Sequence, residues 1–419
     1  MYWLQLLAGG QHINSMHSPV IEQPRRVTKD DAAVAVASIT ADEPSLRAPA
    51  GITSGERFVR LVVLIALLYV FLVGVDVLST GISGLGGGAA DALFHGVANP
   101  LTGLAVGVLA TVLVQSSSVS TSTIVALVGS GVLTLPVAVP IVMGANIGTT
   151  VTSTLASLGA IRRRDDFRRA VAGATVHDLF NLLAVAVLLP LELLTGALSR
   201  MAIALSGVLS GATGGEFDSP IKDAVGRGAG VIESAAAGLF TENGVAAVLL
   251  AAGLALLFAT LVAIARNMRV VVKGAAERSL NAVLGRSGTL GILLGIVLTV
   301  AVQSSSITTS LLVPMMAAGV LTLRNAYPIT LGANVGTTVT ALIAALAVPQ
   351  IEGLQIALVH LLFNLCGILL FFPLPAMRRI PLAGAEWIAE QTSRRRAVVL
   401  VYMTVLFLLL PAAGVFLFG

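Results

Sequence analysis

Only 11% of the 419 residues are charged, 56% are hydrophobic, and the formal net charge is +4. Because a soluble domain carries about 25% charged residues, the composition excludes an ordinary soluble protein and indicates a polytopic membrane protein. The single cysteine, Cys366, excludes an intrachain disulfide and a cysteine-based metal cluster. The arginines form short clusters between apolar segments, a pattern that does not indicate nucleic-acid binding.

The first 56 residues are polar, and we expect a disordered cytoplasmic tail. Their opening decapeptide, MYWLQLLAGG, is too short for a signal peptide and lacks a basic leader. A first span is predicted over 58–78, followed by a glycine-rich break at 81–88 and a short helix that ends at Pro100.

The tetrapeptide QSSS, Gln115 to Ser118, then interrupts an apolar run. Its flanking arms, 101–114 and 119–133, are each too short to cross about 30 Å of hydrocarbon at 1.5 Å per helical residue. Two short arms around a polar centre predict a re-entrant hairpin. Such backbone is stable at membrane depth only when it is buried in protein or faces a water-filled cavity.

Pro136 opens the next predicted span, whose centre reads Gly-Ala-Asn-Ile-Gly-Thr-Thr over 144–150. Two glycines beside Asn and Thr predict a helix broken near the midplane. The basic turn 162–169 reads as a topology signal. A third span over 170–190 carries His177, Asp178 and Asn181, and a polar segment, 210–243, separates the halves of the chain.

The second half repeats this plan. Residues 299–340 match 111–152 without a gap, so QSSS returns as Gln303 to Ser306, and the glycine-rich motif returns within 332–338. The predicted elements are a span over 244–265, a basic amphipathic stretch over 266–286, a second hairpin over 288–320, a broken span over 326–347 and a span over 354–372. A final apolar segment, 397–418, has no counterpart in the first half.

Three full spans and one hairpin per repeat give an odd number of crossings, which inverts the second repeat relative to the first. The predicted fold is an all-α polytopic membrane protein with two inverted-topology repeats, each containing a re-entrant QSSS hairpin and a broken transmembrane helix. The basic clusters then fall on one side, which places the N-terminus in the cytoplasm. The predicted parts are a tail (1–56), repeat 1 (57–209), a non-cytoplasmic connecting segment (210–243), repeat 2 (244–377), and a basic segment with the final helix (378–419).

The QSSS tips carry amide and hydroxyl groups, and a helix begins directly after each tip. Free N–H groups and the positive end of the helix dipole favour an anion there. Serine hydroxyls can surround an oxyanion without a permanent positive charge at the site. An isolated QSSS would more often bridge helices, but its duplication at identical spacing favours a binding site. The candidate anion-binding residues are Gln115, Ser116, Ser117, Ser118, Gln303, Ser304, Ser305 and Ser306.

The two Gly-Ala-Asn-(Ile/Val)-Gly-Thr-Thr segments offer carbonyl, Asn and Thr oxygens, which hard cations such as Na⁺ prefer. Close helix packing is the alternative explanation for their glycines. His177 and Asn181 share a helix face, as do His360 and Asn364, and an interhelical hydrogen bond is the favoured role for the histidines. Asp178, an acid at membrane depth, is a functional candidate, but Leu361 replaces it in the second half.

These motifs resemble the type II sodium-dependent phosphate cotransporters, a family with bacterial and animal members. The resemblance covers roughly residues 60–415 and rests on both QSSS hairpins, GANIGTTVTST, DFRRAVAGATVHDLFN and AYPITLGANVGTTVTALIAAL. It implies sodium-driven import of phosphate by a multi-pass protein of the bacterial inner membrane, with phosphate bound at the QSSS tips. It further implies Na⁺ as the only metal, with no transition metal and no catalytic residue. The implied sodium ligands, with their repeat-related positions, are Gln115, Asn146, Thr149, Asn181, Gln303, Asn334, Thr337, Thr338 and Asn364.

The chain departs from the family pattern in two places. The segment between the halves is short and lacks the cysteines of animal relatives. Where electrogenic relatives carry an aspartate before the DFRRA run, this chain has Arg163, and Asp165 lies out of register. The sequence therefore leaves the number of sodium ions open, and it allows a homodimer without determining the oligomeric state.

Three other functions remain open at this stage. The first is a sodium-coupled carrier for another oxyanion or a dicarboxylate. The second is an intramembrane hydrolase that uses Ser117 with His177 and Asp178, although no G-x-S-x-G motif accompanies these residues. The third is a passive anion channel.

Overall fold

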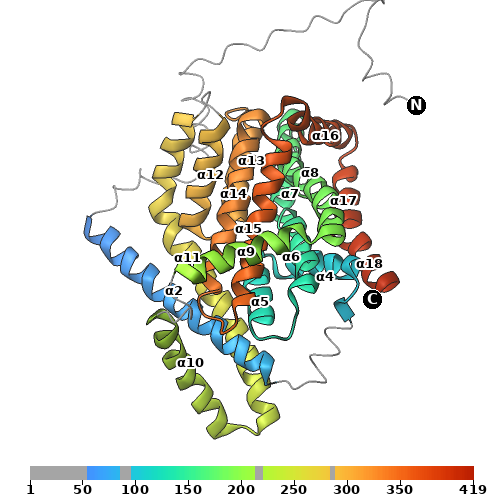
Figure 1. Ribbon diagram of the computed structural model, residues 1–419. Helices are drawn as coiled ribbons and strands as arrows, with labels where there is room; N and C mark the ends of the chain where they lie inside the picture. The colour runs from blue at the N-terminus through green and yellow to red at the C-terminus, as the bar shows by residue number, and fades with distance from the viewer. Residues whose placement is uncertain (1–53, 85–95, 213–219, 284–287) are drawn as a thin grey trace, which may run out of the picture. The chain divides into compact units, whose positions relative to one another are not determined.

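The computed structural model describes residues 54–84, 96–212, 220–283 and 288–419 (Figure 1). The predicted tail lies outside this range, except that its last residues already belong to the first helix. The described residues form helices joined by turns, with no strand among them. In chain order the helices are α2 (Ser54–Ser83), α4 (Pro100–Val114), α5 (Ser117–Gly129), α6 (Leu135–Gly148), α7 (Val151–Ser157), the 3₁₀ turn η1 (Leu158–Ala160), α8 (Arg164–Thr195), α9 (Ala197–Ala212), α10 (Pro220–Leu239), α11 (Glu242–Val283), α12 (Gly288–Val302), α13 (Ser305–Ala317), α14 (Leu323–Ala344), α15 (Ile351–Phe371), α16 (Pro375–Arg394), α17 (Ala397–Thr404), the π-helical turn η2 (Val405–Leu409) and α18 (Leu410–Phe418).

Six helical segments of the described chain are long and apolar enough to cross a membrane. They are Phe58–Ser83, Leu135–Ala160, Arg164–Thr195, Gly244–Met268, Ile351–Phe371 and Ala397–Phe418. The chain is therefore an all-helical polytopic membrane protein. The predicted span over 326–347 is not among the six. Its helix, α14, has 22 residues, but its centre carries Asn334 and several threonines, and these are buried within the protein.

Short helices flank both QSSS segments, as the sequence predicts. α4 and α5 have 15 and 13 residues, and α12 and α13 repeat these lengths. At 1.5 Å per residue each helix spans only about 20 Å, which is less than the hydrocarbon thickness.

The prediction of a broken helix in each repeat is wrong for the second copy. α14 runs without interruption through residues 332–338. In the first copy α6 ends at Gly148 and α7 begins at Val151, but Thr150 between them keeps right-handed helical angles (φ −79°, ψ −16°). The backbone therefore stays close to helical in both copies, and in the first copy the Asn146 carbonyl oxygen accepts from Asn181 Nδ2 at 2.7 Å.

Close helix packing explains the glycines instead. α4 and α6 cross at Gly107 and Gly144. A Cβ atom on Gly107 would lie 2.0 Å from the Ile141 carbonyl oxygen, and one on Gly144 would lie 2.0 Å from the Leu104 carbonyl oxygen. The crossing of α12 and α14 repeats this contact, with Gly295 against the Ile329 oxygen at 2.0 Å and Gly332 against the Ile292 oxygen at 1.9 Å. Small residues that let two backbones touch are typical of helix packing in membranes.

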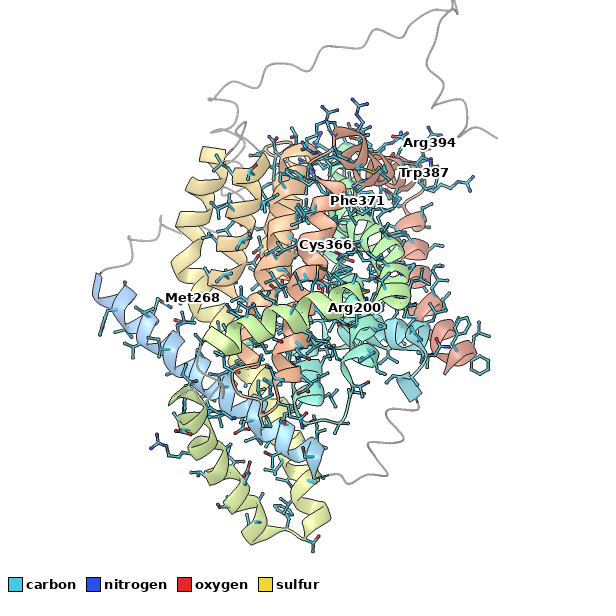
Figure 2. All side chains as sticks on the ribbon, viewed as in Figure 1. Arg200, Met268, Cys366, Phe371, Trp387 and Arg394 are labelled. Atoms are coloured by element: carbon cyan, nitrogen blue, oxygen red, sulfur yellow. The ribbon has the colours of Figure 1, made fainter. Side chains whose placement is uncertain are left out.

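Two basic segments lie at the same end of the structure. Arg168, at the start of α8, is 3.6 Å from Glu390 on α16, and Arg396 donates to the Arg162 carbonyl oxygen at 3.3 Å. The Arg394 hydrogen bond to Glu390 also lowers the pKa of that carboxyl. In Figure 2, Arg394 and Trp387 lie at this end, whereas Cys366 lies partway along α15.

The predicted connecting segment, 210–243, is more structured than a polar linker. It contains α10, which packs against α2, and the Tyr69 hydroxyl donates to the Ala224 carbonyl oxygen at 3.0 Å. Residues 213–219 lie outside the described chain. The basic stretch predicted after 265 continues α11 to Val283, so that it extends one long helix.

The final apolar segment packs onto the first half of the chain. α18 contacts α4, and Tyr402 of α17 reaches α8. This segment has no repeat-related partner, yet it joins the packing of the first repeat.

The glycine crossings generate a stability prediction. Gly144→Ala and Gly332→Ala should each destabilise the folded protein by about 1–3 kcal/mol, because the added methyl group overlaps a backbone oxygen that cannot move alone. Melting of the purified protein in detergent measures this effect. The matched control is Gly226→Ala on α10, where an added Cβ atom meets nothing within 4 Å. Equal melting temperatures for Gly144→Ala and Gly226→Ala would contradict the packing role.

Candidate functional site

The two QSSS tips share one local geometry. Gln115 and Gln303 are the only described non-glycine residues with positive φ, at 56° and 54°. Ser116 and Ser304 follow in extended conformation, and each side chain accepts from the N–H three residues further on, at 3.3 and 3.4 Å. A serine cap satisfies one of the free N–H groups at a helix start and leaves others available. Each tip therefore leads directly into the N-terminus of a 13-residue helix.

The glutamine side chains hold the tips in place. Each carboxamide nitrogen donates back to a carbonyl of the preceding helix, at Val112 for Gln115 and at Val300 for Gln303. Each carboxamide oxygen accepts from a threonine hydroxyl, Thr152 at 3.4 Å in the first copy and Thr340 at 2.8 Å in the second. Neither threonine is among the site residues predicted from the sequence. Thr152 and Thr340 are the last residues of the matched segments 111–152 and 299–340, and this equivalence could have indicated them.

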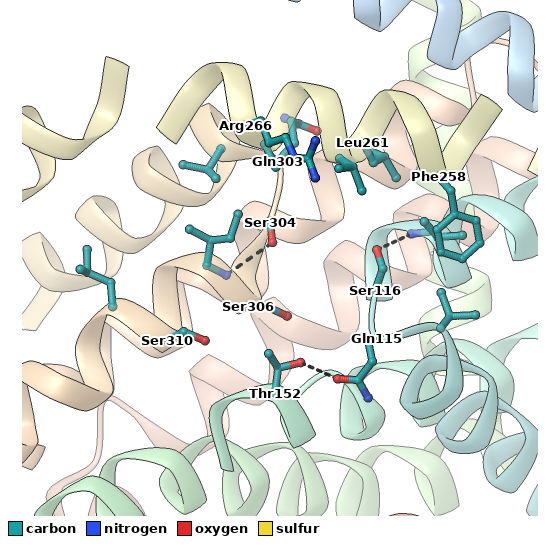
Figure 3. A pocket seen from close by; sticks show the side chains of 17 residues that line it. Gln115, Ser116, Thr152, Phe258, Leu261, Arg266, Gln303, Ser304, Ser306 and Ser310 are labelled. Atoms are coloured by element: carbon teal, nitrogen blue, oxygen red, sulfur yellow. Dashed lines mark hydrogen bonds between the residues drawn. The ribbon is translucent and has the colours of Figure 1, made fainter. Parts of the chain in front are cut away.

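Both tips line one pocket of about 780 Å³ (Figure 3). The tips contribute Gln115, Ser116, Gln303, Ser304 and Ser306 to its wall. The other lining residues come from the neighbouring helices and from the arms of the two tips. They are Val114, Val119, Thr152, Phe258, Leu261, Val262, Ala265, Arg266, Val302, Ile307, Ser310 and Leu311. The pocket thus combines an apolar wall with polar groups that converge from both copies, as small-molecule sites usually do.

The other three predicted anion-binding serines do not line this pocket. Ser117, Ser118 and Ser305 are buried beneath the tips. The Ser118 hydroxyl donates to the Gln303 carbonyl oxygen at 3.3 Å and so joins the two tips directly. The Ser305 hydroxyl is buried without a hydrogen-bond partner among the described residues. The two copies therefore contribute differently, since Ser306 faces the pocket whereas its counterpart Ser118 does not.

The predicted histidine and asparagine residues connect the two halves. His177 Nε2 lies 2.5 Å from Asn334 Oδ1, and Asn334 Nδ2 donates to Asn181 Oδ1 at 2.8 Å. The reciprocal contacts place Asn146 Oδ1 3.4 Å from His360 Nε2 and 3.3 Å from Asn364 Nδ2. The interhelical role predicted for the histidines is confirmed.

The predicted sodium ligands fall into two sets. Gln115 and Gln303 line the pocket, whereas the others are buried between the helices. In this buried set the hydroxyls of Thr149, Thr337 and Thr338 donate to carbonyls of their own helices at 2.8, 3.0 and 2.7 Å. A hydroxyl that donates its proton keeps oxygen lone pairs available to a cation. Asn364 Oδ1 is buried and has no partner among the described residues.

Asp178 lies apart from these residues and bonds to the final span. Its Oδ2 accepts from the Tyr402 hydroxyl at 2.8 Å and from the Thr154 hydroxyl at 3.3 Å, while Oδ1 has no described partner. Within the described chain, His177 bonds to Asn334 and Asp178 to Tyr402 and Thr154. Neither residue bonds to Ser117, so the arrangement required for the hydrolase alternative is not formed.

One charged side chain stands in the pocket wall. Arg266 of α11 lines the pocket together with both tips, although the tips themselves carry only neutral groups. From the sequence, Arg266 was predicted only as part of a basic stretch. The anion site was predicted to have no fixed positive charge, whereas Arg266 brings one to the pocket wall. Arg163, where the family pattern departs, is remote from this chemistry: its side chain is 86% exposed and lies 3.8 Å from Asp166.

The contact between the halves generates a coupling prediction. His177→Ala and Asn334→Ala should each destabilise the protein, and the double variant should lose less than the sum of the two. The difference should be about 0.5–3 kcal/mol, because both substitutions remove the same buried contact. Chemical or thermal unfolding of the four proteins in detergent gives this value. Strict additivity would show that the two side chains do not interact.

The Tyr402 contact generates a second prediction. Tyr402→Phe should destabilise the protein by about 1–3 kcal/mol, because a buried carboxyl loses its shortest hydrogen-bond donor. Tyr69→Phe is the matched control, since the Tyr69 hydroxyl bonds to an exposed carbonyl and its loss should have a smaller effect. Similar melting temperatures for the two variants would contradict a structural role for the Tyr402 hydroxyl.

A family model described as Na+/Pi-cotransporter matches residues 70–209 and 255–381, which contain both tips. Sodium-dependent phosphate transport protein 2A of Ovis aries is 35% identical over 86% of this chain and 68% of its own length. Protein 2B of Homo sapiens is 33% identical over 84% of the chain and 64% of its own length, and protein 2C of Rattus norvegicus is 36% identical over 85% and 72%. No solved structure matches this chain. The matches cover both copies of the repeated segment, and the chain belongs to the Na+/Pi-cotransporter family.

Proposed function

We propose that this protein is a secondary active transporter that imports inorganic phosphate together with sodium ions. The observation that carries the proposal is the convergence of both QSSS tips on one pocket. Relatives over most of the chain are sodium-dependent phosphate transport proteins. The protein moves its substrate and is not an enzyme.

Phosphate binding is assigned to the pocket face of the tips. Ser116, Ser304 and Ser306 present hydroxyl groups there, and the helices that begin after the tips direct N–H groups and the positive ends of their dipoles towards the same region. Of the buried Ser117, Ser118 and Ser305, Ser118 supports the tip backbone through its hydrogen bond to the Gln303 carbonyl oxygen. The Ser305 hydroxyl is buried without a hydrogen-bond partner in the described part of the chain, so it is available to a ligand.

Sodium binding is assigned to oxygen atoms next to the tips. Gln303 and the buried set of Asn146, Thr149, Asn181, Asn334, Thr337, Thr338 and Asn364 supply neutral oxygens, and Gln115 is the repeat-related partner of Gln303. Neutral oxygens suit a hard monovalent cation that must be released again. Asn364 Oδ1 is buried without a hydrogen-bond partner among the described residues, so its lone pairs are available to a cation. A cation close to the phosphate would reduce the electrostatic cost of moving each ion alone, which is a physical route to coupling.

The transport proposal includes the topology. Two inverted repeats, each with a re-entrant hairpin, would bring the tips to the pocket from opposite faces and allow alternating access. The basic segments that meet through Arg168 and Glu390 agree with a common cytoplasmic end. On this basis the N-terminus is proposed to lie at the cytoplasmic end. The protein is proposed to reside in the bacterial inner membrane, where it can assemble as a homodimer.

The first test is uptake of labelled phosphate by proteoliposomes that contain the purified protein. Uptake should require an inward sodium gradient and should stop when potassium replaces sodium. Sodium-independent uptake would refute cotransport and favour the channel alternative. Competition by unlabelled sulfate, arsenate and dicarboxylates separates phosphate from the other anions.

Ser306→Ala tests the pocket assignment. It should raise the KM for phosphate about tenfold or more, because a hydrogen bond to a charged group is worth about 1.5–3 kcal/mol. Ser130→Ala is the control. This serine follows the C-terminus of α5, away from the first tip, and bonds to the Leu127 carbonyl oxygen. An unchanged KM in Ser306→Ala would remove this hydroxyl from the phosphate site.

A further inference from the structure

The charge in the pocket wall comes from α11, a helix outside both tips. Residues 258, 261, 262, 265 and 266 all line the pocket, and their spacing of three and four places them on one face of this helix. Phe258, Leu261, Val262 and Ala265 make this face apolar. Arg266 is the only charged side chain among the described residues that line the pocket.

Arg266 is not neutralised by the part of the protein that the structure describes. Its side chain is exposed, and it takes no part in the ion pairs that Asp166 and Glu390 form elsewhere in the described chain. The neighbouring residue, Asn267, is used differently. It faces α2, where its side chain bonds to the backbone and the guanidinium of Arg60 at 2.8 and 3.3 Å. On α11, Asn267 therefore packs against α2, whereas its neighbour Arg266 lines the pocket.

We propose that Arg266 is a specificity-determining residue that attracts phosphate into this pocket and contacts it from α11. This inference rests on the proposed function and adds a residue to that site. A guanidinium group can donate two parallel hydrogen bonds to one phosphate. The tips then fix the position of the anion with neutral donors, and the arginine makes the pocket selective for negative charge.

A transporter must release its phosphate again, and the exposure of Arg266 is compatible with release. A buried arginine would attract phosphate strongly in a medium of low dielectric constant, whereas an exposed one is screened by water and ions. Moderate attraction raises the local concentration of the anion without trapping it. The charge also stands on α11, so the phosphate contacts of the tips and that of the arginine belong to different helices.

The experiment measures the kinetics of sodium-dependent phosphate uptake in proteoliposomes. Arg266→Gln should raise the KM for phosphate about tenfold while maximal uptake and the sodium concentration for half-activation stay close to those of the unmodified protein. Arg266→Lys should restore most of the affinity, because it keeps the charge but loses the planar fork. Arg60→Gln is the matched control. It removes an equal charge from α2, the helix that Asn267 contacts, and should leave the KM unchanged.

A measurement without any substitution complements the variants. At constant sodium, added choline chloride should raise the phosphate KM of the unmodified protein and should change that of Arg266→Gln much less. An unchanged KM in Arg266→Gln would overturn the inference, as would an equal rise in Arg60→Gln. If Arg266→Gln does not fold, a KM of the unmodified protein that is insensitive to ionic strength would overturn it. Absence of sodium-dependent uptake in the unmodified protein would instead refute the proposed function.

Discussion

At Gln115 and Gln303 the backbone adopts a left-handed conformation that residues with side chains avoid, at a cost of about 1–2 kcal/mol each. The surroundings are apolar, so the polar groups released by the break must find partners within the protein. The chain supplies them, because each glutamine bonds to its own helix and to a threonine 37 residues further along, and the next serine caps the new helix. Strain of this kind persists only where neighbouring contacts determine it, and such places are commonly binding sites. The pocket owes its shape to these two breaks.

The contacts between the copies explain why the tips meet. Asn146 of α6 and Asn334 of α14 lie next to the two glycine crossings, and each bonds to the histidine and the asparagine of the other half. The glycines bring the crossing backbones into contact, and the asparagines fix the register between the halves. Neither half could satisfy these buried amides alone. The position of one tip relative to the other therefore depends on a network that lies beneath the pocket.

Much of this arrangement could be predicted from the sequence, because the QSSS segments interrupt apolar runs that are too short to cross a bilayer. The glycine-rich motifs were ambiguous, since Gly144 and Gly332 suit either a broken helix or a close crossing. Only the neighbouring backbones, at Leu104 and Ile292, decide in favour of the crossing. Arg266 could not be assigned in advance, because its place in the pocket depends on the rotation of α11 relative to segments far away in the chain. The same holds for Tyr402, whose partner Asp178 has no repeat-related equivalent.

The two matched copies do not build a symmetrical site. Ser306 lines the pocket, whereas Ser118 uses its hydroxyl to hold the Gln303 carbonyl, and Thr152 lines the pocket whereas Thr340 is buried. The buried amides differ as well, because the contacts of Asn334 are shorter than those of Asn146. One local sequence therefore supports two sets of contacts within a single structure. Since the Gln, Ser, Thr, Asn and His residues of these contacts are present in both copies, an arrangement with exchanged contacts would involve the same chemical groups. Under the proposed alternating access, exchange of these contacts between the copies would connect the two states.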